Sequence, residues 1–179
     1  ILQAGGYNVT IGSLHTNNGS GTLASTANDG LGGFEGTAGS SAWIENASTT
    51  PGTIAITQTT PVTVEALWDV QFRNGQLPSH FFNQSDCVGA ALSVSKLGSG
   101  WATMTLDNDY TGTTRVSAGI LQVGKNGVGD TGATNAAGAI VENGGVIAGT
   151  GTVQGGLVVQ SGGELRPGDV AGGAAGVLT

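Results

Sequence analysis

Two stretches near the C-terminal end of the sequence, Ile140–Ile147 (IVENGGVI) and Val158–Leu165 (VVQSGGEL), share one pattern. A β-branched apolar pair is followed by two polar residues, a Gly-Gly pair and a second short run. Related units occur at Val70–Leu77 and Val116–Leu121. Short apolar runs bounded by glycine are typical of β-strands joined by tight turns. The repeated unit therefore predicts recurring pairs of strands.

The glycine turns recur at a nearly regular spacing. Gly163 lies 18 positions after Gly145, and Gly145 lies 26 positions after Gly119. The surplus falls in residues 125–138, which are rich in Gly, Ala, Asn and Thr and are predicted to form a loop. A period of roughly 20 residues with insertions at one corner suits a stack of strands, because each circuit of the chain pairs only with its neighbours. The spacing favours a solenoid of strands over a closed barrel.

The composition agrees with an all-β fold without long helices. The 179 residues include 34 Gly and 4 Pro, about 21% of the chain, where average usage is about 12%. Only 9% of residues are charged and 38% are hydrophobic, which differs from the composition of disordered chains. In a stack of strands, small apolar residues suffice inside, and polar residues pair along outward ladders.

The charges exclude several classes of partner. Five scattered basic residues face twelve acidic ones, giving a net charge of −7. This pattern cannot neutralise phosphates, so neither a nucleic acid nor an anionic membrane surface is expected as a partner. Residues 127–132 match the glycine fingerprint of dinucleotide sites, but no helix pattern follows them, so no nucleotide and no cofactor is expected.

Few residues could carry nucleophilic or metal chemistry. Cys87 is the single cysteine, which excludes an internal disulfide framework and a cysteine zinc cluster. It follows His80 by seven residues and could be drawn as a Cys-His pair, but a loop histidine beside a buried cysteine is the preferred interpretation. His15 is the other histidine, and no Gly-x-Ser-x-Gly turn occurs. We expect no catalytic residues and no metal ligands.

One acidic cluster leaves an enzymatic alternative open. Enzymes that cleave polysaccharides use paired carboxylates, and here Asp107, Asp109 and Asp130 are the candidates. A polysaccharide-degrading β-helix enzyme is therefore kept as the last-ranked alternative. A solvated acidic corner is the preferred interpretation of these residues.

The run Lys96–Gly124 resembles the strand repeat of bacterial autotransporter passengers. It contains Lys-x-Gly-x-Gly at 96–100, Asn-x-Tyr-Thr-Gly-x-Thr-x-Val at 108–116 and Gly-x-Leu-x-Val-Gly at 119–124. Ala102 departs from the family pattern, which usually has Leu at this position.

The sequence downstream of this run is similar to the last rungs of such passengers, the region called the autochaperone. The similarity lies in residues 149–153, 162–168 and 176–179, with an extension at 169–175. The chain is accordingly divided into residues 1–95, with irregular rungs and long loops, and residues 96–179, with the strand repeat and autochaperone-like rungs.

The resemblance implies a right-handed parallel β-helix, a solenoid, with irregular loops in its N-terminal half. It implies a non-enzymatic segment of a surface protein that reaches the bacterial cell surface through the periplasm and outer membrane. Its C-terminal rungs would act as a stable stem and folding nucleus. The expected partners are the N-terminal rungs of its own passenger and its own C-terminal outer-membrane barrel. That barrel and any signal peptide are expected outside this sequence.

The residues expected to carry the folding role are inward-packing side chains and turn formers. They are Tyr110, Gly112, Val116, Gly119, Leu121, Val123, Ile140, Val141, Ile147, Val153, Val158 and Leu165.

Trp101 is the candidate binding residue. It stands where the repeat normally has an outward Thr, which leaves exposure and stacking on a host glycan or protein open. An aromatic side chain that covers a rung edge or loop is the preferred interpretation. An adhesin surface that binds a host protein or glycan through the loops before residue 90 is the second candidate function.

Overall fold

The computed structural model describes residues 2–3, 8–11, 42–46, 50–59, 61–68, 70–74, 90–125, 129–132, 136–171 and 176–179. Every regular element in these ranges is a β-strand, and all fourteen strands pair in parallel. The prediction of an all-β chain built from parallel strands is confirmed. Within the described ranges, no helix is long and apolar enough to cross a membrane.

The strands form three sheets. The six-stranded sheet contains, in spatial order, β13 (Leu157–Val159), β11 (Ala139–Val141), β9 (Thr114–Val116), β7 (Leu92–Leu97), β4 (Gly52–Thr57) and β2 (Asn8–Ile11). The five-stranded sheet contains β14 (Glu164–Pro167), β12 (Gly145–Gly149), β10 (Gly119–Val123), β8 (Trp101–Met104) and β5 (Glu65–Trp68). The three-stranded sheet contains β1 (Leu2–Gln3), β3 (Ala42–Glu45) and β6 (Val70–Arg73).

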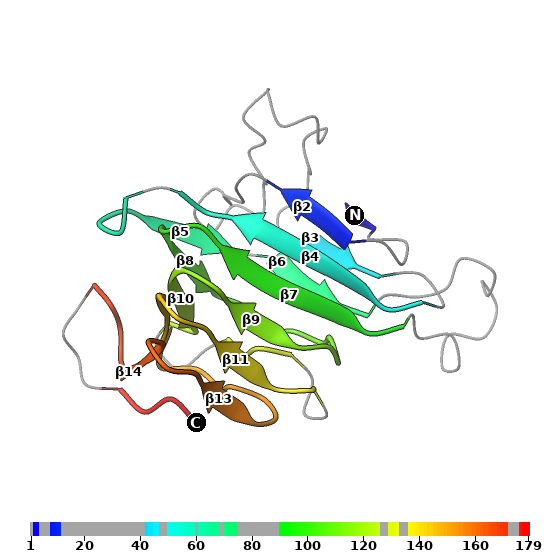
Figure 1. The fold of residues 1–179 in the computed structure, drawn as a ribbon. Coiled ribbons are helices and arrows are strands. Elements are labelled where there is room, and N and C mark those ends of the chain that lie inside the picture. The colour runs from blue at the N-terminus through cyan, green and yellow to red at the C-terminus, as the bar shows by residue number, and fades with distance from the viewer. Residues whose placement is uncertain are drawn as a thin grey trace.

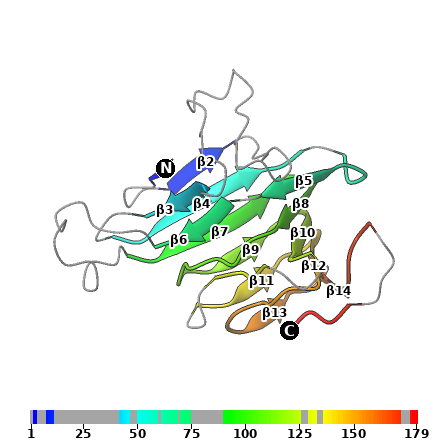
Figure 2. The ribbon, with the colours of Figure 1, turned by 180° about the vertical axis from the view of Figure 1, so that it is seen from behind.

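The chain visits these sheets in one repeated order. From β4 onward it passes from the six-stranded sheet to the five-stranded sheet and then along a third side of the stack. In one circuit β6 forms this third side, and in the next circuit Asp109 continues it through a parallel bridge to Arg73. We call each such circuit a rung. The strands of successive rungs are stacked in sequence order, and the two chain ends lie at opposite ends of the stack (Figures 1 and 2). This β-helix-like arrangement follows from local turns that repeat in phase.

The glycine spacing predicted the register of the C-terminal rungs. Gly119 pairs with Gly145, 26 positions later, and Val146 pairs with Glu164, 18 positions later. Both offsets equal those between the glycine turns, so the predicted register is confirmed there. Among earlier strands the offset is larger, since Ile54 pairs with a residue 40 positions later in β7. The boundary at residue 95 stays a prediction.

Inward-facing side chains form apolar columns along the stack. Successive side chains of a strand point to opposite faces, so alternate positions in β4 and β7 are buried. On the five-stranded sheet, Ala102, Leu121 and Ile147 pair in one column and are fully buried. Two edge-to-face contacts, between Trp68 and Phe72 and between Phe72 and Tyr110, add aromatic packing at 6.0 and 6.4 Å between ring centroids.

Three of the predicted inward packers do not pack in the core. Ile140 and Val158 pair with each other, in the column of Arg115, so the register turns them outward, and Val158 is 56% exposed. The prediction was wrong because a strand of three residues exposes its middle side chain when its two ends face the core. Leu165 pairs with the buried Ile147 but is 43% exposed, because no later rung of the described chain covers it.

Candidate functional site in the C-terminal rungs

Lys96 occupies an inward position in β7, between Ile56 and Val116 in the pairing register. Its side chain is fully buried. The ammonium donates hydrogen bonds to the backbone carbonyls of Leu97, Gly98 and Ala118, at 3.1, 2.7 and 3.0 Å. Burial lowers its pKa from 10.5 to about 8. Lys96 thus closes the corner between two successive rungs from inside.

Two of the predicted glycines are required by close backbone approach. Gly119 has a φ of +65°, and a Cβ there would lie 2.4 Å from the carbonyl oxygen of Gly100 in the preceding rung. A Cβ on Gly112 would lie 2.2 Å from the carbonyl oxygen of Leu92. Any side chain at either position would push neighbouring rungs apart.

Tyr110 anchors a buried polar chain at the third side of the stack. Its hydroxyl lies 2.5 Å from Oγ1 of Thr114, whose hydroxyl in turn donates to the carbonyl of Thr131 in the next rung at 3.2 Å. Burial raises the pKa of the Tyr110 hydroxyl, so this group stays protonated. The contacts join the third side to the start of β9 and to the next rung, and a phenylalanine at this position would not make them.

The acidic cluster serves the backbone in this structure. Asp130 accepts hydrogen bonds at Oδ1 from the backbone amides of Asn108 and Gly132, at 2.5 and 3.2 Å. Burial raises its pKa, and these hydrogen bonds oppose the rise. Asp107 accepts a hydrogen bond from the amide of Gly129, while Asp109 is exposed and bridges to the preceding rung through its backbone. The arrangement fits a corner of the stack at which carboxylates accept hydrogen bonds from backbone amides.

Part of the outer face of the five-stranded sheet is also buried. Trp101, Ile120 and Ala148 form a second apolar cluster on it, separate from the core. Trp101 is only 4% exposed, which agrees with the preferred interpretation of a covering aromatic side chain and contradicts an open stacking site. Val146 and Val170 pack against this cluster. The indole Nε1 of Trp101 has no hydrogen-bond partner among the described residues.

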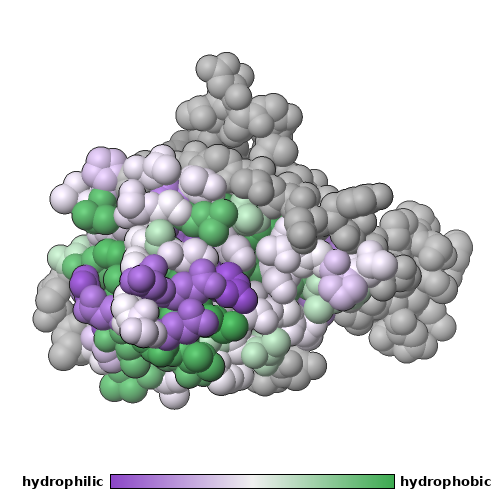
Figure 3. Space-filling view, viewed as in Figure 1, coloured by the Kyte–Doolittle hydropathy of each residue, from purple (hydrophilic) through white to green (hydrophobic). Residues whose placement is uncertain are grey.

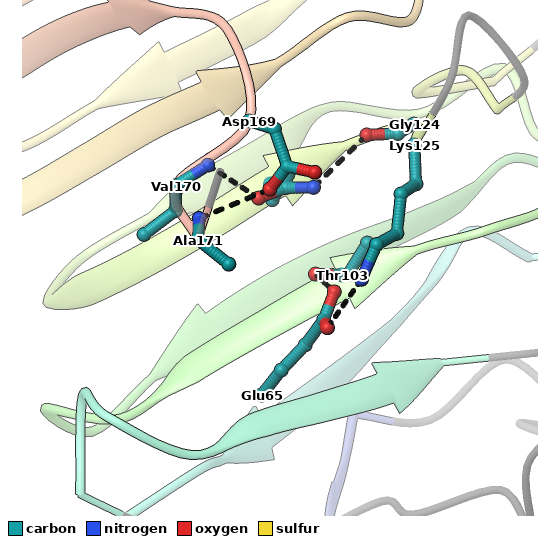
Figure 4. A network of polar contacts seen from close by, with 8 residues as sticks. Glu65, Thr103, Gly124, Lys125, Asp169, Val170 and Ala171 are labelled. Atoms are coloured by element: carbon teal, nitrogen blue, oxygen red, sulfur yellow. Dashed lines mark hydrogen bonds and ion pairs between the residues drawn. The ribbon is translucent and has the colours of Figure 1, made fainter. Parts of the chain in front are cut away.

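A C-terminal strap, defined here as residues 168–171, holds Val170 over the outer face. Gly168 exchanges two backbone hydrogen bonds with Gly149, at 2.8 and 2.9 Å. The amide of Val170 donates to Oε1 of Gln122 at 3.0 Å (Figure 4). Residues 169–171 of the strap lie in the segment 169–175, which the sequence analysis predicted as an extension of the last rungs.

Beside the strap, Lys125 and Glu65 form an ion pair on the same face. Their Nζ and Oε2 atoms are 2.7 Å apart, and Oε1 of Glu65 accepts a 2.7 Å hydrogen bond from Thr103 (Figure 4). The Glu65 carboxylate is largely covered, with 17% of its side chain exposed. This pair joins residues 60 positions apart in the sequence.

The C-terminal end of the stack exposes apolar side chains. Val159 pairs with the buried Val141 and faces the same way, yet it is 40% exposed. Figure 3 shows hydrophobic surface at the lower end of the view, over β13, beside a hydrophilic strip. Thr179 accepts from the amide of Val153 and donates to the carbonyl of Gly151, so the chain resumes the third side of the stack there.

The remaining predicted folding residues occupy the following places. Those that are fully buried in the core are Tyr110, Val116, Leu121, Val123, Val141 and Ile147. Val153 is half-buried and packs against the same core.

The structure also shows which residues the sequence interpretation did not select. Lys96 was noticed only as part of a motif, although its inward parity with Leu92 and Val94 was visible in the sequence. No sequence signal marks Gln122 or Lys125. His15, His80 and Cys87 lie outside the described residues. Within those residues, no group of three His, Cys, Asp or Glu side chains is placed to hold a metal ion.

The fold defines a stack of parallel strands with buried polar groups at its corners. In this stack, residues 94–123 match the family described as passenger-associated-transport-repeat. The match covers about a sixth of the chain and spans β7 to β10. The chain therefore carries a repeat of autotransporter passengers, which implies a secreted or surface-exposed protein. No curated protein and no solved structure matches the chain.

Proposed function

We propose that this segment is part of the stem of an autotransporter passenger, a right-handed parallel β-helix whose C-terminal rungs act as the folding nucleus, or autochaperone. The observation that carries the proposal is the position of the passenger repeat. It lies at the centre of the parallel stack and contains the corner closed by Lys96 and the buried hydroxyl of Tyr110. These internal contacts join successive rungs of the stem.

Loop lengths support folding that begins in the C-terminal rungs. Paired residues there are 18 to 26 positions apart, whereas β2 and β4 pair at an offset of 45 and β4 and β7 at 40. Closing a loop twice as long costs about 0.6 kcal/mol more. Short closures therefore favour the C-terminal rungs as the first to form.

In the proposed mechanism, each folded rung presents unpaired N–H and C=O groups along its strand edges to the rung before it. Such edges bind an extended segment readily. Because every rung contacts mainly its neighbours, folding can then propagate in one direction along the chain. The partner of this segment is the N-terminal part of its own passenger, and the destination is the cell surface, by way of the periplasm and outer membrane.

Two matched core substitutions test the direction of folding. Ile147 in β12 and Ile56 in β4 are both fully buried isoleucines, and Ile→Val at either site is expected to cost about 0.5–1.5 kcal/mol. If the C-terminal rungs form the nucleus, Ile147→Val slows folding by up to about fivefold, and Ile56→Val mainly speeds unfolding. Stopped-flow folding in urea measures both rates. Folding that Ile56→Val slows as much as Ile147→Val does would contradict the nucleus.

We further propose that the segment has no catalytic role and binds no cofactor. Supporting this, Asp130 is engaged by backbone amides, and Lys125 neutralises the largely covered carboxylate of Glu65. Incubation with acidic polysaccharides is expected to release no reducing sugar. Release that is lost in Asp130→Asn would instead support the enzymatic alternative.

A further inference from the structure

Two polar contacts on the outer face of the five-stranded sheet each skip a rung. Glu65 pairs in register with Trp101, and Trp101 pairs with Ile120, so β5 and β10 are two rungs apart. The ion pair between Glu65 and Lys125, which follows β10, therefore passes over β8.

The second contact repeats this geometry toward the C-terminus. Gln122 lies in β10, and Val170 follows β14, with β12 between them in the sheet order. The hydrogen bond from the Val170 amide to Gln122 joins residues 48 positions apart. Val170 also packs against the cluster of Trp101, Ile120 and Ala148, which draws one residue from each of three rungs. The two contacts share β10 and together span all five strands.

We infer that this outer face is a clamp that makes the rungs from β5 to the strap open as one unit. In an array where each rung contacts only its neighbours, the last rung frays first, because it has one neighbour instead of two. A contact to the rung beyond the neighbour removes this freedom, since the end can then leave only by breaking bonds with β10 as well. The inference does not depend on the proposed secretion role.

Burial makes the clamp effective. Gln122 and Thr103 point outward from the sheet but are fully buried. Gln122 also donates to the carbonyl of Gly124, so its amide is oriented toward the strap (Figure 4). A buried donor or acceptor that loses its partner costs more than an exposed one, because water does not replace the partner. Detaching the strap would uncover this polar group and the apolar cluster together.

Native-state hydrogen exchange of the full chain in a urea series tests the clamp. Two backbone amides report on its two ends: Gly168, bonded to Gly149 in the strap, and Ile120, bonded to Gly100 in the middle of the sheet. If the clamp holds, both amides exchange through openings with the same free energy and the same urea dependence. An amide of Gly168 that exchanges through a small local opening in the unaltered protein would overturn the inference.

Two variants cut the clamp at different atoms. Val170→Ala trims the strap side chain, and Gln122→Met removes the acceptor while keeping the length of the side chain. Each should speed exchange at Gly168 at least fivefold relative to Ile120, the change expected from one lost contact of about 1 kcal/mol. Because Val170 is only half-buried, its variant keeps the core intact. An unchanged ratio between the two amides in both variants would refute the clamp.

Arg115→Met is the matched control. Arg115 pairs with Glu142 of the next rung on the six-stranded sheet, so this ion pair skips no rung. Its loss should leave the ratio of exchange rates at Gly168 and Ile120 as it is in the unaltered protein. If Arg115→Met changes the ratio of exchange rates at Gly168 and Ile120 as much as Val170→Ala does, any outward contact has this effect, and the clamp is rejected.

Discussion

The charge on Lys96 is expected to make stability rise with pH. In the folded chain, burial lowers the pKa of this lysine to about 8. In an unfolded chain a lysine titrates near pH 10.4. Between about pH 8 and pH 10.4 the unfolded state therefore binds more protons than the folded state, so the free energy of unfolding increases with pH in this window. Below pH 8 Lys96 is charged in both states, and the buried ammonium lowers the free energy of unfolding by a constant amount.

The magnitude follows from the two pKa values. Their full difference corresponds to about 3 kcal/mol, but the hydrogen bonds to three carbonyls stabilise the buried ammonium and reduce this difference. We therefore expect about 1–2 kcal/mol between pH 7 and pH 10. Lys96→Met removes the titrating group and keeps a long apolar side chain, so the pH-dependent part should vanish in this variant.

Urea unfolding of both proteins at pH 7, 8, 9 and 10 measures the effect, with far-UV circular dichroism and Trp fluorescence as probes. The raised pKa of Tyr110 lowers stability above about pH 10 in both proteins, so it cancels in the difference between them. The free energy of unfolding of the unaltered protein should rise with pH relative to that of the Lys96→Met variant. A difference that stays flat or moves the other way would show that Lys96 is not buried as a charged group.

Four further substitutions test the packing of the rungs, each by urea unfolding at pH 7. Leu121→Ala removes a fully buried side chain and should cost about 2–5 kcal/mol, whereas Val158→Thr at a 56% exposed site should stay within about 0.5 kcal/mol, and equal effects would contradict the register. Gly119→Ala should cost more than about 1 kcal/mol, because its φ is +65° and the added Cβ meets the carbonyl of Gly100, and an unchanged midpoint would argue against this corner. Tyr110→Phe should cost about 1–3 kcal/mol by leaving buried polar groups without their partner, and a neutral effect would show that water replaces the hydroxyl.

Much of the strand register was accessible from the sequence. The turn glycines at 119, 145 and 163 repeat at the offsets that the sheet adopts, because a tight turn is a local feature and returns once in every rung. The inward parity of Leu121, Val123 and Ile147 follows from alternation and is visible without coordinates.

Predictions failed where the outcome depended on more than one rung. Val158 and Val159 are both β-branched and apolar, so the sequence does not show which of the two faces the core. The register aligns Val158 with Ile140 and Arg115, which turns Val158 outward. Trp101 faces away from the core, as its place in the repeat indicated, but only the tertiary structure shows that it is buried in the outer cluster.

By itself, the amino-acid sequence determined the all-β character, the repeated strand pairs and the resemblance to passenger repeats, because these features are written in short segments. The tertiary structure alone decided which outward residues are covered and which polar groups meet. Gln122 and Val170 are 48 positions apart, and Glu65 and Lys125 are 60 apart. Both contacts join residues two rungs apart, yet the two separations in sequence differ, because insertions of unequal length separate the rungs. Such contacts arise only when loops fold back over a completed sheet, and the local pattern of each strand carries no information about them.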